Sequence, residues 1–345
     1  MTELPARIRD TATLEQLLSE PTPAVVQVLR QFPGDIVVLG AGGKMGPSLT
    51  RMLRRAAEQA GQARRIFAVS RFSQVSTAQA LREQGVQTIA CDLLEPVSIR
   101  QLPDAALVFY LVGSKFGTTG NEARTWAINA YLPGLVAERY RQSRIVAFST
   151  GNVYGMAPAV SGGSCESDPP RPDGEYAASA LGRERVLEFC SRCWHIPMTI
   201  LRLNYAHELR YGVLVDIARA VLEERPIPLA MGCFNALWQG DANAWAIQSL
   251  AYADCPPRVL NLAGPETVSV RWAALQFARH FEKSPQFVGT EAPDAYLSNA
   301  AQAHRLFGYP RVPLGLLIEW IADWFATGKT VWDKPTHFEV RTGHF

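Results

Sequence analysis

The chain has 345 residues, of which 48% are hydrophobic, and its 34 Lys and Arg residues nearly balance 32 Asp and Glu residues. This length and composition predict a folded protein with more than one compact unit. A net charge of only +2 argues against the concentrated positive field of a nucleic-acid-binding surface, and no apolar run approaches the roughly 20 residues that span a bilayer. We therefore expect a cytoplasmic protein without nucleic-acid or membrane partners.

The six cysteines are expected to be reduced thiols, because the start of the sequence has no apolar stretch typical of a secretory signal. Cys190 and Cys193 form a C-x-x-C pair within a predicted helix. A zinc site of this kind needs a second pair of ligands. The sequence therefore predicts no metal site.

The predicted elements begin with a helical extension over residues 1–33, where Leu14, Leu17 and Leu18 have helical spacing. From residue 35 onward, continuous apolar strands alternate with helices, two of them expected at about 120–142 and 176–192. The strands are expected at 36–40, 66–70, 87–90, 106–112, 145–149 and 199–203. Apolar strands separated by helices indicate a parallel sheet covered on both faces. The predicted fold class is α/β, a doubly wound Rossmann sheet.

The regular alternation ends after Asn204. Further helices are expected near 212–224, 271–283, 297–307 and 314–328, and a strand at 259–264. We expect residues 34–205 and 236–262 to form the dinucleotide-binding domain. Residues 206–235 and 263–345 are then a smaller C-terminal substrate domain. It ends in a stretch that resembles a surface tail, although its aromatic residues suggest that it packs against the protein.

A glycine-rich turn follows the first strand and opens a helix. Gly40, Gly43 and Gly46 are spaced three residues apart, with Lys44 and Met45 between the last two. Glycine lets the backbone approach a pyrophosphate, and the N-terminus of the following helix supplies N–H donors. In this strand–turn–helix context the motif predicts dinucleotide binding.

The second strand ends in Ser70 and Arg71, where a carboxylate would accept the ribose hydroxyls of NAD. An arginine there can pair with a 2′-phosphate, and Lys44 could add a second positive charge. NADP is therefore favoured over NAD. Asp92 and Leu93 follow the third strand and are expected beside the adenine, although Asp92 could also cap a helix.

Two later motifs, together with the glycine turn, carry a resemblance to a known family. "STGNVYG" contains Thr150, Tyr154 and Gly155, and "EYAASALGRE" contains Tyr176, Ser179 and Glu184. With the glycine turn, Asp92 and Asn129, the chain resembles the extended short-chain dehydrogenase/reductases of the NAD-dependent epimerase/dehydratase family over roughly residues 35–330. The resemblance implies a Rossmann domain, a smaller substrate domain, frequent action on nucleotide-activated sugars, and a homodimer formed through the helices near 120–142 and 176–192.

The resemblance also implies roles for single residues. Thr150 matches the residue that holds the substrate hydroxyl, and Tyr176 matches the tyrosine that exchanges the proton. Asn129 matches an asparagine in the helix before Thr150. Ala180, however, stands where the family has a lysine that lowers the tyrosine pKa and binds the nicotinamide ribose.

The missing lysine matters because a free tyrosine titrates near a pKa of about 10. A cation about 5 Å away contributes on the order of 3 kcal/mol at an effective dielectric near 20. Lys115, just past the fourth strand, is the best candidate for a substitute. Arg183 shares the helix face of Tyr176, but two turns separate them by roughly 10 Å, so no direct contact is expected.

Three explanations of Ala180 stay open. The protein could run slow chemistry with a rearranged proton relay, it could bind the cofactor without catalysis, or the alanine could be an engineered replacement. We predict an NAD(P)-dependent oxidoreductase or epimerase that acts on a sugar or sugar-derived hydroxyl or ketone. The alternative is a catalytically impaired NADP-binding regulatory protein.

We expect the substrate contacts to come from loops around the crevice above the parallel strands, where the dinucleotide is predicted to bind. The candidates are Asn152, Asn204, His207, Arg210, Asn235 and Trp238. The stretch "RLNYAHELR" lacks the Gly-Pro-like loop of the sugar-nucleotide epimerases. A nucleotide-linked sugar, a free sugar and a sugar acid are therefore all open as substrates.

Overall fold

The centre of the fold is a seven-stranded parallel sheet. The computed structural model describes residues 4–343, and the strand order is β12-β7-β5-β4-β1-β2-β3, every neighbouring pair being parallel. The strands are β1 (Ile36–Leu39), β2 (Ile66–Ser70), β3 (Gln87–Ala90), β4 (Leu107–Tyr110), β5 (Arg144–Thr150), β7 (Met198–Leu203) and β12 (Arg258–Leu262). The predicted doubly wound α/β fold is confirmed, and the strand order reverses between β1 and β4.

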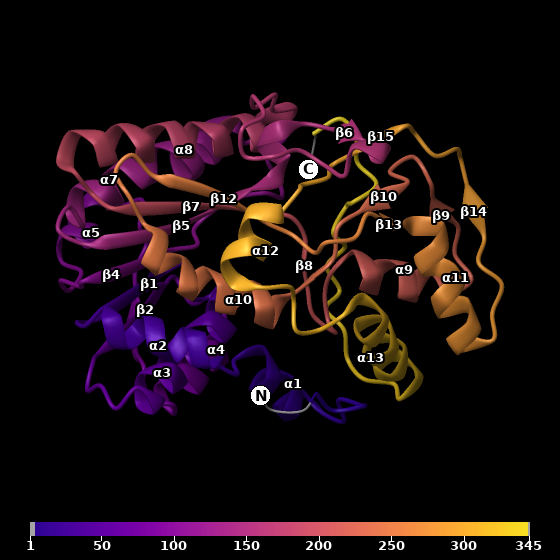
Figure 1. Cartoon of the computed structure of the whole chain (residues 1–345), viewed down its shortest axis with the longest axis horizontal. Coiled ribbons are helices and arrows are strands. Elements are labelled where there is room, and N and C mark those ends of the chain that lie inside the picture. Colours follow the sequence, from indigo (N-terminus) through magenta and orange to yellow (C-terminus); the bar gives the residue numbers. More distant parts are fainter. Residues whose placement is uncertain (1–3, 344–345) are drawn as a thin grey trace.

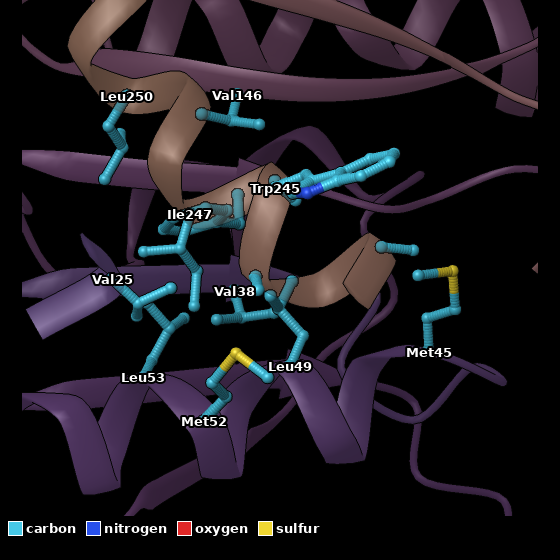
Figure 2. Close-up of a cluster of buried hydrophobic side chains, with 14 of the residues drawn as sticks. Val25, Val38, Met45, Leu49, Met52, Leu53, Val146, Trp245, Ile247 and Leu250 are labelled. Carbon is cyan, nitrogen blue, oxygen red and sulfur yellow. The ribbon is translucent and has the colours of Figure 1, made fainter. Parts of the chain in front are cut away.

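One face of the sheet is covered by α2 (Pro23–Gln31), α3 (Gly46–Gln59) and α10 (Gln239–Gln248). Figure 2 shows Val25 of α2, Leu49 and Leu53 of α3 and Ile247 of α10 gathered around Val38 of β1. The helix α10 lies about 200 residues after β1 in the sequence, so this layer of the fold joins distant parts of the chain. α4 (Val75–Arg82) connects β2 to β3 at the sheet edge.

The opposite face is covered by α5 (Pro96–Arg100), α7 (Leu132–Arg139) and α8 (Gly174–Trp194). The helix expected at about 120–142 consists of three pieces: α6 (Glu122–Trp126), a π-helical turn (Ala127–Tyr131) and α7. Single π-helical turns inside a helix often accompany functional sites. Here the turn carries Asn129.

A second apolar core lies beside the sheet, on the right of Figure 1. It is built from α1 (Thr11–Leu18), α9 (Val213–Leu222), α11 (Val270–Phe281) and α13 (Leu314–Ala326), with α12 (Ala301–Phe307) between the two cores. The N-terminal extension joins both cores, because α1 packs in the second and α2 in the first. The short strands are β6 (Ala157–Pro158), β8 (Ala206–His207), β9 (Ile227–Pro228), β10 (Cys233–Phe234), β11 (Leu237–Trp238), β13 (Val268–Ser269), β14 (Phe287–Val288) and β15 (Asp294–Ala295).

The segment after α13 is packed along the second core, as its aromatic residues suggested, and is not a loose surface tail. Phe338 is buried in that core, the main-chain N–H of Thr336 donates to Asp216 Oδ2 over 2.8 Å, and Arg341 Nη1 donates to the Asp294 carbonyl over 2.8 Å. Gly343 lies against the backbone of Asp173, just before α8. The aromatic and charged side chains of this segment thus have partners that lie more than 40 residues away in the sequence.

Membrane-spanning helices and clusters of metal-binding side chains were not expected from the sequence. Within residues 4–343, none of the helices has both the length and the apolar character of a membrane span. The same residues contain no group of three His, Cys, Asp or Glu side chains that could hold a metal ion, and Cys190 and Cys193 are free thiols.

Candidate active site

The glycine turn lies at the carboxyl end of β1, where the strand order reverses. Gly40 has a φ of +87°, and its N–H donates to the Val69 carbonyl over 2.9 Å. A Cβ on Gly46 would lie 2.5 Å from the Ala41 carbonyl oxygen, so the start of α3 can approach the turn this closely only without a side chain. These contacts explain the spacing of the glycines.

The N-terminus of α3 points its free N–H groups toward the turn. Its N-cap residue is Met45, which makes no side-chain cap hydrogen bond, and Pro47 lies in the first turn. The unsatisfied N–H groups and the helix dipole favour an anion at this place. Met45 and Gly46 are buried and do not line the cleft above the turn, although both were predicted as cofactor contacts.

A cleft of about 260 Å³ opens above this turn, between the ends of β1, β2, β3 and β4. Six of the predicted cofactor residues line it: Gly40, Gly43, Ser70, Arg71, Asp92 and Leu93. The sequence reasoning missed Gly42, Phe72, Ser73, Cys91, Leu94, Leu111, Val112, Gly113, Ser114, Arg124, Ile128 and Leu132. Most of these follow strand ends, so the rule that ligands bind at the carboxyl edge of a parallel sheet could have found them.

Lys44 does not lie beside Arg71, where a second charge for a 2′-phosphate was predicted. Its Nζ donates to the Ala206 carbonyl oxygen and lies 4.6 Å from the centroid of the Tyr211 ring. Burial lowers the pKa of Lys44 to about 8, against the opposing effect of Glu208. The side chain leaves the turn toward β8, and the second cation on the cleft is instead Arg124.

Asp92 is exposed, and its Oδ1 accepts the N–H of Leu94 over 3.0 Å. The carboxylate therefore both lines the cleft and stabilises the turn after β3. The prediction that Asp92 caps the following helix is wrong, because the N-cap residue of α5 is Glu95 and the helix has no side-chain cap.

Thr150 and Tyr176 are brought together. Thr150 is the last residue of β5 and Tyr176 lies in the first turn of α8. Burial raises the pKa of Tyr176, while a side-chain hydrogen bond with Thr150 and the positive charge of Arg183 lower it. The Thr150 hydroxyl also donates to Asn152 Oδ1 over 3.0 Å, so the hydroxyl pair is held in one arrangement.

A buried ion pair anchors the helix that carries Tyr176. Arg202 Nη2 on β7 donates to Glu184 Oε2 of α8 over 2.6 Å, and the Ser149 hydroxyl of β5 donates to Glu184 Oε1 over 2.5 Å. Both charged side chains are almost completely buried. One carboxylate thus ties α8 to two central strands, next to Thr150.

Asn129 connects the loop after β4 to α8. Its Nδ2 donates to the Ser114 carbonyl over 2.9 Å and to Ser179 Oγ over 3.0 Å, and its Oδ1 accepts the Ser114 N–H over 2.8 Å. The side chain is completely buried. Asn129, predicted as a cofactor contact, therefore holds Ser114 of the cleft wall in place through two backbone hydrogen bonds and does not itself line the cleft.

Lys115 lies beyond this loop, among aromatic rings. Its Nζ is 5.3 Å from the centroid of Phe116 and 5.9 Å from that of Tyr205. Burial lowers the pKa of Lys115 to about 8, although Glu339 and Asp216 raise it. The lysine thus faces the second core and the packed C-terminal segment.

Three of the predicted substrate residues are inside polar networks. Asn204 Nδ2 donates to the Tyr296 carbonyl over 3.1 Å, Asn235 Oδ1 accepts the Ser298 N–H over 2.9 Å, and Asn152 is bonded to Thr150. All three side chains are buried. Of these, the structure brings Asn152 next to the hydroxyl pair.

The other three lie where the two cores meet. Trp238 is 1% exposed and packs edge-on against Trp320, with ring centroids 5.5 Å apart. His207 is completely buried, with Nδ1 2.9 Å from the Tyr205 carbonyl. Arg210 is paired with Glu15 and Glu208. Trp238 therefore lies in the packed interior, and the amphipathic pattern alone could not distinguish it from a pocket residue.

Comparison with known proteins gives one family. The sequence profile of the NAD dependent epimerase/dehydratase family matches residues 36–222, more than half of the chain. A search of curated protein sequences finds no match.

Solved structures of that kind share the fold. A UDP-glucuronic acid 4-epimerase from Bacillus cereus, in complex with UDP-glucuronic acid and NAD, has a TM-score of 0.69 at 19% identity, covering 85% of this chain and 99% of that one. A UDP-glucose 4-epimerase from Thermotoga maritima with UDP-glucose gives 0.70 at 16%, with 85% and 99% covered. A dTDP-glucose 4,6-dehydratase from Streptomyces venezuelae with NAD bound gives 0.73 at 16%, with 85% and 97% covered.

The profile match covers the glycine turn, the cleft and the hydroxyl pair in one stretch, and it confirms the resemblance drawn from the sequence motifs. The chain belongs to the NAD dependent epimerase/dehydratase family.

Proposed function

We propose that the protein is an NAD(P)-dependent oxidoreductase or epimerase that acts on a sugar or sugar-derived hydroxyl or ketone. The observation that supports it best is the hydrogen bond between Thr150 and Tyr176 at the carboxyl edge of the sheet. The glycine turn lies at the same edge, two strands away in the sheet order. The similar solved structures hold NAD or sugar nucleotides.

The residues of the cleft fit a dinucleotide. A Cβ on Gly42 would lie 2.7 Å from Ser70 Oγ, and one on Gly40 would lie 3.1 Å from the backbone of Leu111 and Val112. The backbone therefore forms a cradle that side chains would fill, beside the free N–H groups of α3. A bound nicotinamide would supply the hydride acceptor and donor of the reaction.

The chain's own residues would then handle the proton and the orientation. Tyr176 is the general acid and base, and Thr150 orients the reacting oxygen of the substrate. Asn152 supports Thr150, because its Oδ1 accepts a hydrogen bond from the Thr150 hydroxyl. For the substrate contacts, we retain Asn152, Asn204, His207, Arg210 and Asn235 as the set to be tested. Trp238 is left out because it packs against Trp320 in the interior, and Lys115 remains the further candidate for a catalytic residue.

We propose a preference for NADP over NAD. Arg71 and Arg124 both line the cleft, and β2 ends at Ser70 without a carboxylate that would repel a 2′-phosphate. Arginine pairs with phosphate through charge-assisted hydrogen bonds. Asp92 follows β3, the strand next to β2. Its carboxylate could bind the ribose hydroxyls of NAD, so NAD stays the alternative cofactor.

We further propose that the protein is a cytoplasmic homodimer. The predicted dimer helices pack side by side on one face of the sheet, and they carry the exposed apolar side chains of Trp126, Tyr131 and Phe189. We also propose that residues 206–235 and 263–345 form the substrate domain. Light scattering after gel filtration tests the dimer, and Tyr131→Glu should convert it to a monomer.

The alternative is a catalytically impaired NADP-binding regulatory protein, and the observation that favours it is Ala180. One experiment separates the two. Wild type, Tyr176→Phe and Thr150→Val are assayed with both cofactors on a panel of nucleotide-linked sugars, free sugars and sugar acids. The exposed Tyr309→Phe is the matched control.

The enzyme proposal expects turnover in wild type and the control, and a loss of about a hundredfold or more in Tyr176→Phe. Binding of NADPH without turnover of any substrate, together with no effect of Tyr176→Phe, would support the regulatory protein instead.

A further inference from the structure

Position 180 holds no charge, and its surroundings are apolar. Ala180 is completely buried and packs against Val153 and Tyr154. A neutral methyl group there cannot stabilise a phenolate on Tyr176, one helical turn earlier. If Tyr176 exchanges a proton, the positive charge has to come from another residue.

Arg183 brings a guanidinium to this side of α8. It follows Ala180 by three residues and therefore lies on the same helix face. Helical side chains lean toward the N-terminus of their helix, so a long arginine covers the preceding turn. The roughly 10 Å of helix rise between Tyr176 and Arg183 separates their backbones, whereas a long side chain can reduce the separation between the phenol and the guanidinium.

The guanidinium is fixed by three hydrogen bonds. Nη1 donates to the Phe148 carbonyl over 2.7 Å, Nη2 donates to Asn129 Oδ1 over 2.9 Å, and Nε donates to the Asn129 carbonyl over 3.3 Å. All three acceptors are uncharged, and Arg183 is only 5% exposed. Within residues 4–343, Arg183 forms no ion pair with an Asp or Glu.

An unpaired buried cation is unusual, because buried charges normally have a charged partner. Its positive potential is therefore available to neighbouring groups. The charge of Arg183 lowers the pKa of Tyr176, and it also opposes the rise that burial causes in the pKa of Tyr110. Burial raises the pKa of Tyr205 and of Tyr211, and Tyr176 in turn raises both further.

The same guanidinium adjoins the cleft wall. A Cβ on Gly113, which lines the cleft, would lie 2.9 Å from Nη2. Asn129 shares its Oδ1 between Arg183 and the N–H of Ser114, the next residue of that wall. One side chain thus connects the hydroxyl pair on β5 and α8 with the wall that a dinucleotide would touch.

We propose that Arg183 supplies the positive charge that position 180 lacks, and acts as the positioning residue for Tyr176 and the cleft wall. The catalytic role of Arg183 rests on the proposed function. Its effect on the charge of the Tyr176 phenol does not, and it can be measured without any turnover.

The test uses ¹³C-tyrosine NMR of the full chain without cofactor, with Tyr176 assigned from Tyr176→Phe. Arg183→Gln keeps an amide donor for Phe148 and Asn129 but removes the charge, and Arg183→Lys keeps the charge. The double variant Ala180→Lys with Arg183→Gln returns a cation to the lysine position. Arg185→Gln, an exposed arginine on the same helix, is the matched control.

We expect Arg183→Gln to raise the pKa of Tyr176 by about one unit, which is a tenfold smaller phenolate fraction at a given pH. In Arg183→Lys and in the double variant, the pKa of Tyr176 should stay near the wild-type value. In Arg185→Gln it should equal the wild-type value. An unchanged Tyr176 pKa in Arg183→Gln with a lowered Tm would overturn the proposal and leave Arg183 as a structural clamp.

If Arg183→Gln does not fold, Arg183→Lys decides the question against wild type, because it keeps the charge and loses the fork of hydrogen bonds. A Tyr176 pKa near the wild-type value despite a lowered Tm then supports the proposal, and a rise of about one unit overturns it. The proposed function fails separately: a protein that binds neither NAD nor NADP can still show the Tyr176 shift, and an active enzyme can lack it.

Discussion

Arg183 Nη1 on α8 donates a 2.7 Å hydrogen bond to the main-chain carbonyl of Phe148 on β5. Phe148 lies two residues before Thr150, and Arg183 lies seven residues after Tyr176. The bond therefore fixes the separation of the two elements that carry the hydroxyl pair. Glu184, one residue further along α8, makes a second connection to β5 through the Ser149 hydroxyl and connects α8 to β7 through Arg202.

Gly46→Ala tests the close approach of α3 to the glycine turn. The added Cβ would lie 2.5 Å from the Ala41 carbonyl oxygen, so the helix start must shift. We expect a loss of about 1–3 kcal/mol of stability and weaker dinucleotide binding, measured by thermal unfolding and calorimetry. Gly315→Ala in α13 meets no atom within 4 Å and should be neutral or slightly stabilising; equal effects of the two substitutions would contradict this account.

Glu184→Gln should destabilise the protein strongly. It leaves the buried Arg202 guanidinium without its charged partner, and removing one member of a buried ion pair costs about 3–5 kcal/mol. Chemical denaturation measures the change. Glu188→Gln on the same helix breaks only exposed pairs with Arg185 and Arg192 and should cost less than about 0.5 kcal/mol. Similar losses in both variants would show that the Glu184 pair is not energetically special.

Arg71→Ala tests the choice between the two nicotinamide cofactors. Arg71 lines the cleft at the end of β2 and is exposed enough to meet a 2′-phosphate. We expect the Kd for NADP⁺ to rise about tenfold or more, because a charge-assisted bond to phosphate is lost, and the Kd for NAD⁺ to stay within about twofold. Arg82→Ala at the end of α4 is the control. A parallel loss for both cofactors would assign Arg71 to general electrostatic attraction.

His207 should make stability depend on pH. Burial, and then the charge of Lys44, lower the pKa of His207 to about 3, so the folded ring stays neutral. The unfolded chain binds a proton below a pKa of about 6.5, and the free energy of unfolding therefore falls as the pH drops from about 6.5 toward 3. At pH 5 this amounts to about 2 kcal/mol.

Comparing the pH dependence of unfolding in wild type and His207→Gln measures this contribution. The variant should lose less stability between pH 6.5 and 5, whereas the exposed His280→Gln should follow wild type. Identical slopes in wild type and His207→Gln would mean that the His207 ring takes up its proton in the folded state.

The sheet and the glycine turn could be predicted from the sequence because their causes are local. Continuous apolar strands such as residues 36–39 indicate a sheet covered on both faces, and Gly46 is a glycine because its own backbone neighbours leave no room for a side chain. The alternating strands and helices also fix the carboxyl edge, which places Arg71 and Asp92 on the cleft.

Side-chain direction could not be predicted in the same way. Lys44 belongs to the glycine turn, but its Nζ bonds to the Ala206 carbonyl 162 residues later. Arg183 makes no hydrogen bond to Tyr176 among the described contacts, as the helix rise predicted, but its guanidinium bonds to Phe148 and Asn129 far away in the sequence. Trp238 and His207 lie in short strands between the cores, where no periodic pattern distinguishes a pocket residue from a packed one.

Calorimetric titration of the purified chain with NADP⁺ and NAD⁺ tests the central claim most directly. The account predicts saturable binding of at least one of them at one site per chain, with NADP⁺ bound more tightly and with weaker binding in Gly46→Ala. No heat with either cofactor, in the oxidised or the reduced form, would contradict the assignment of the cleft above β1 and β4 to a dinucleotide.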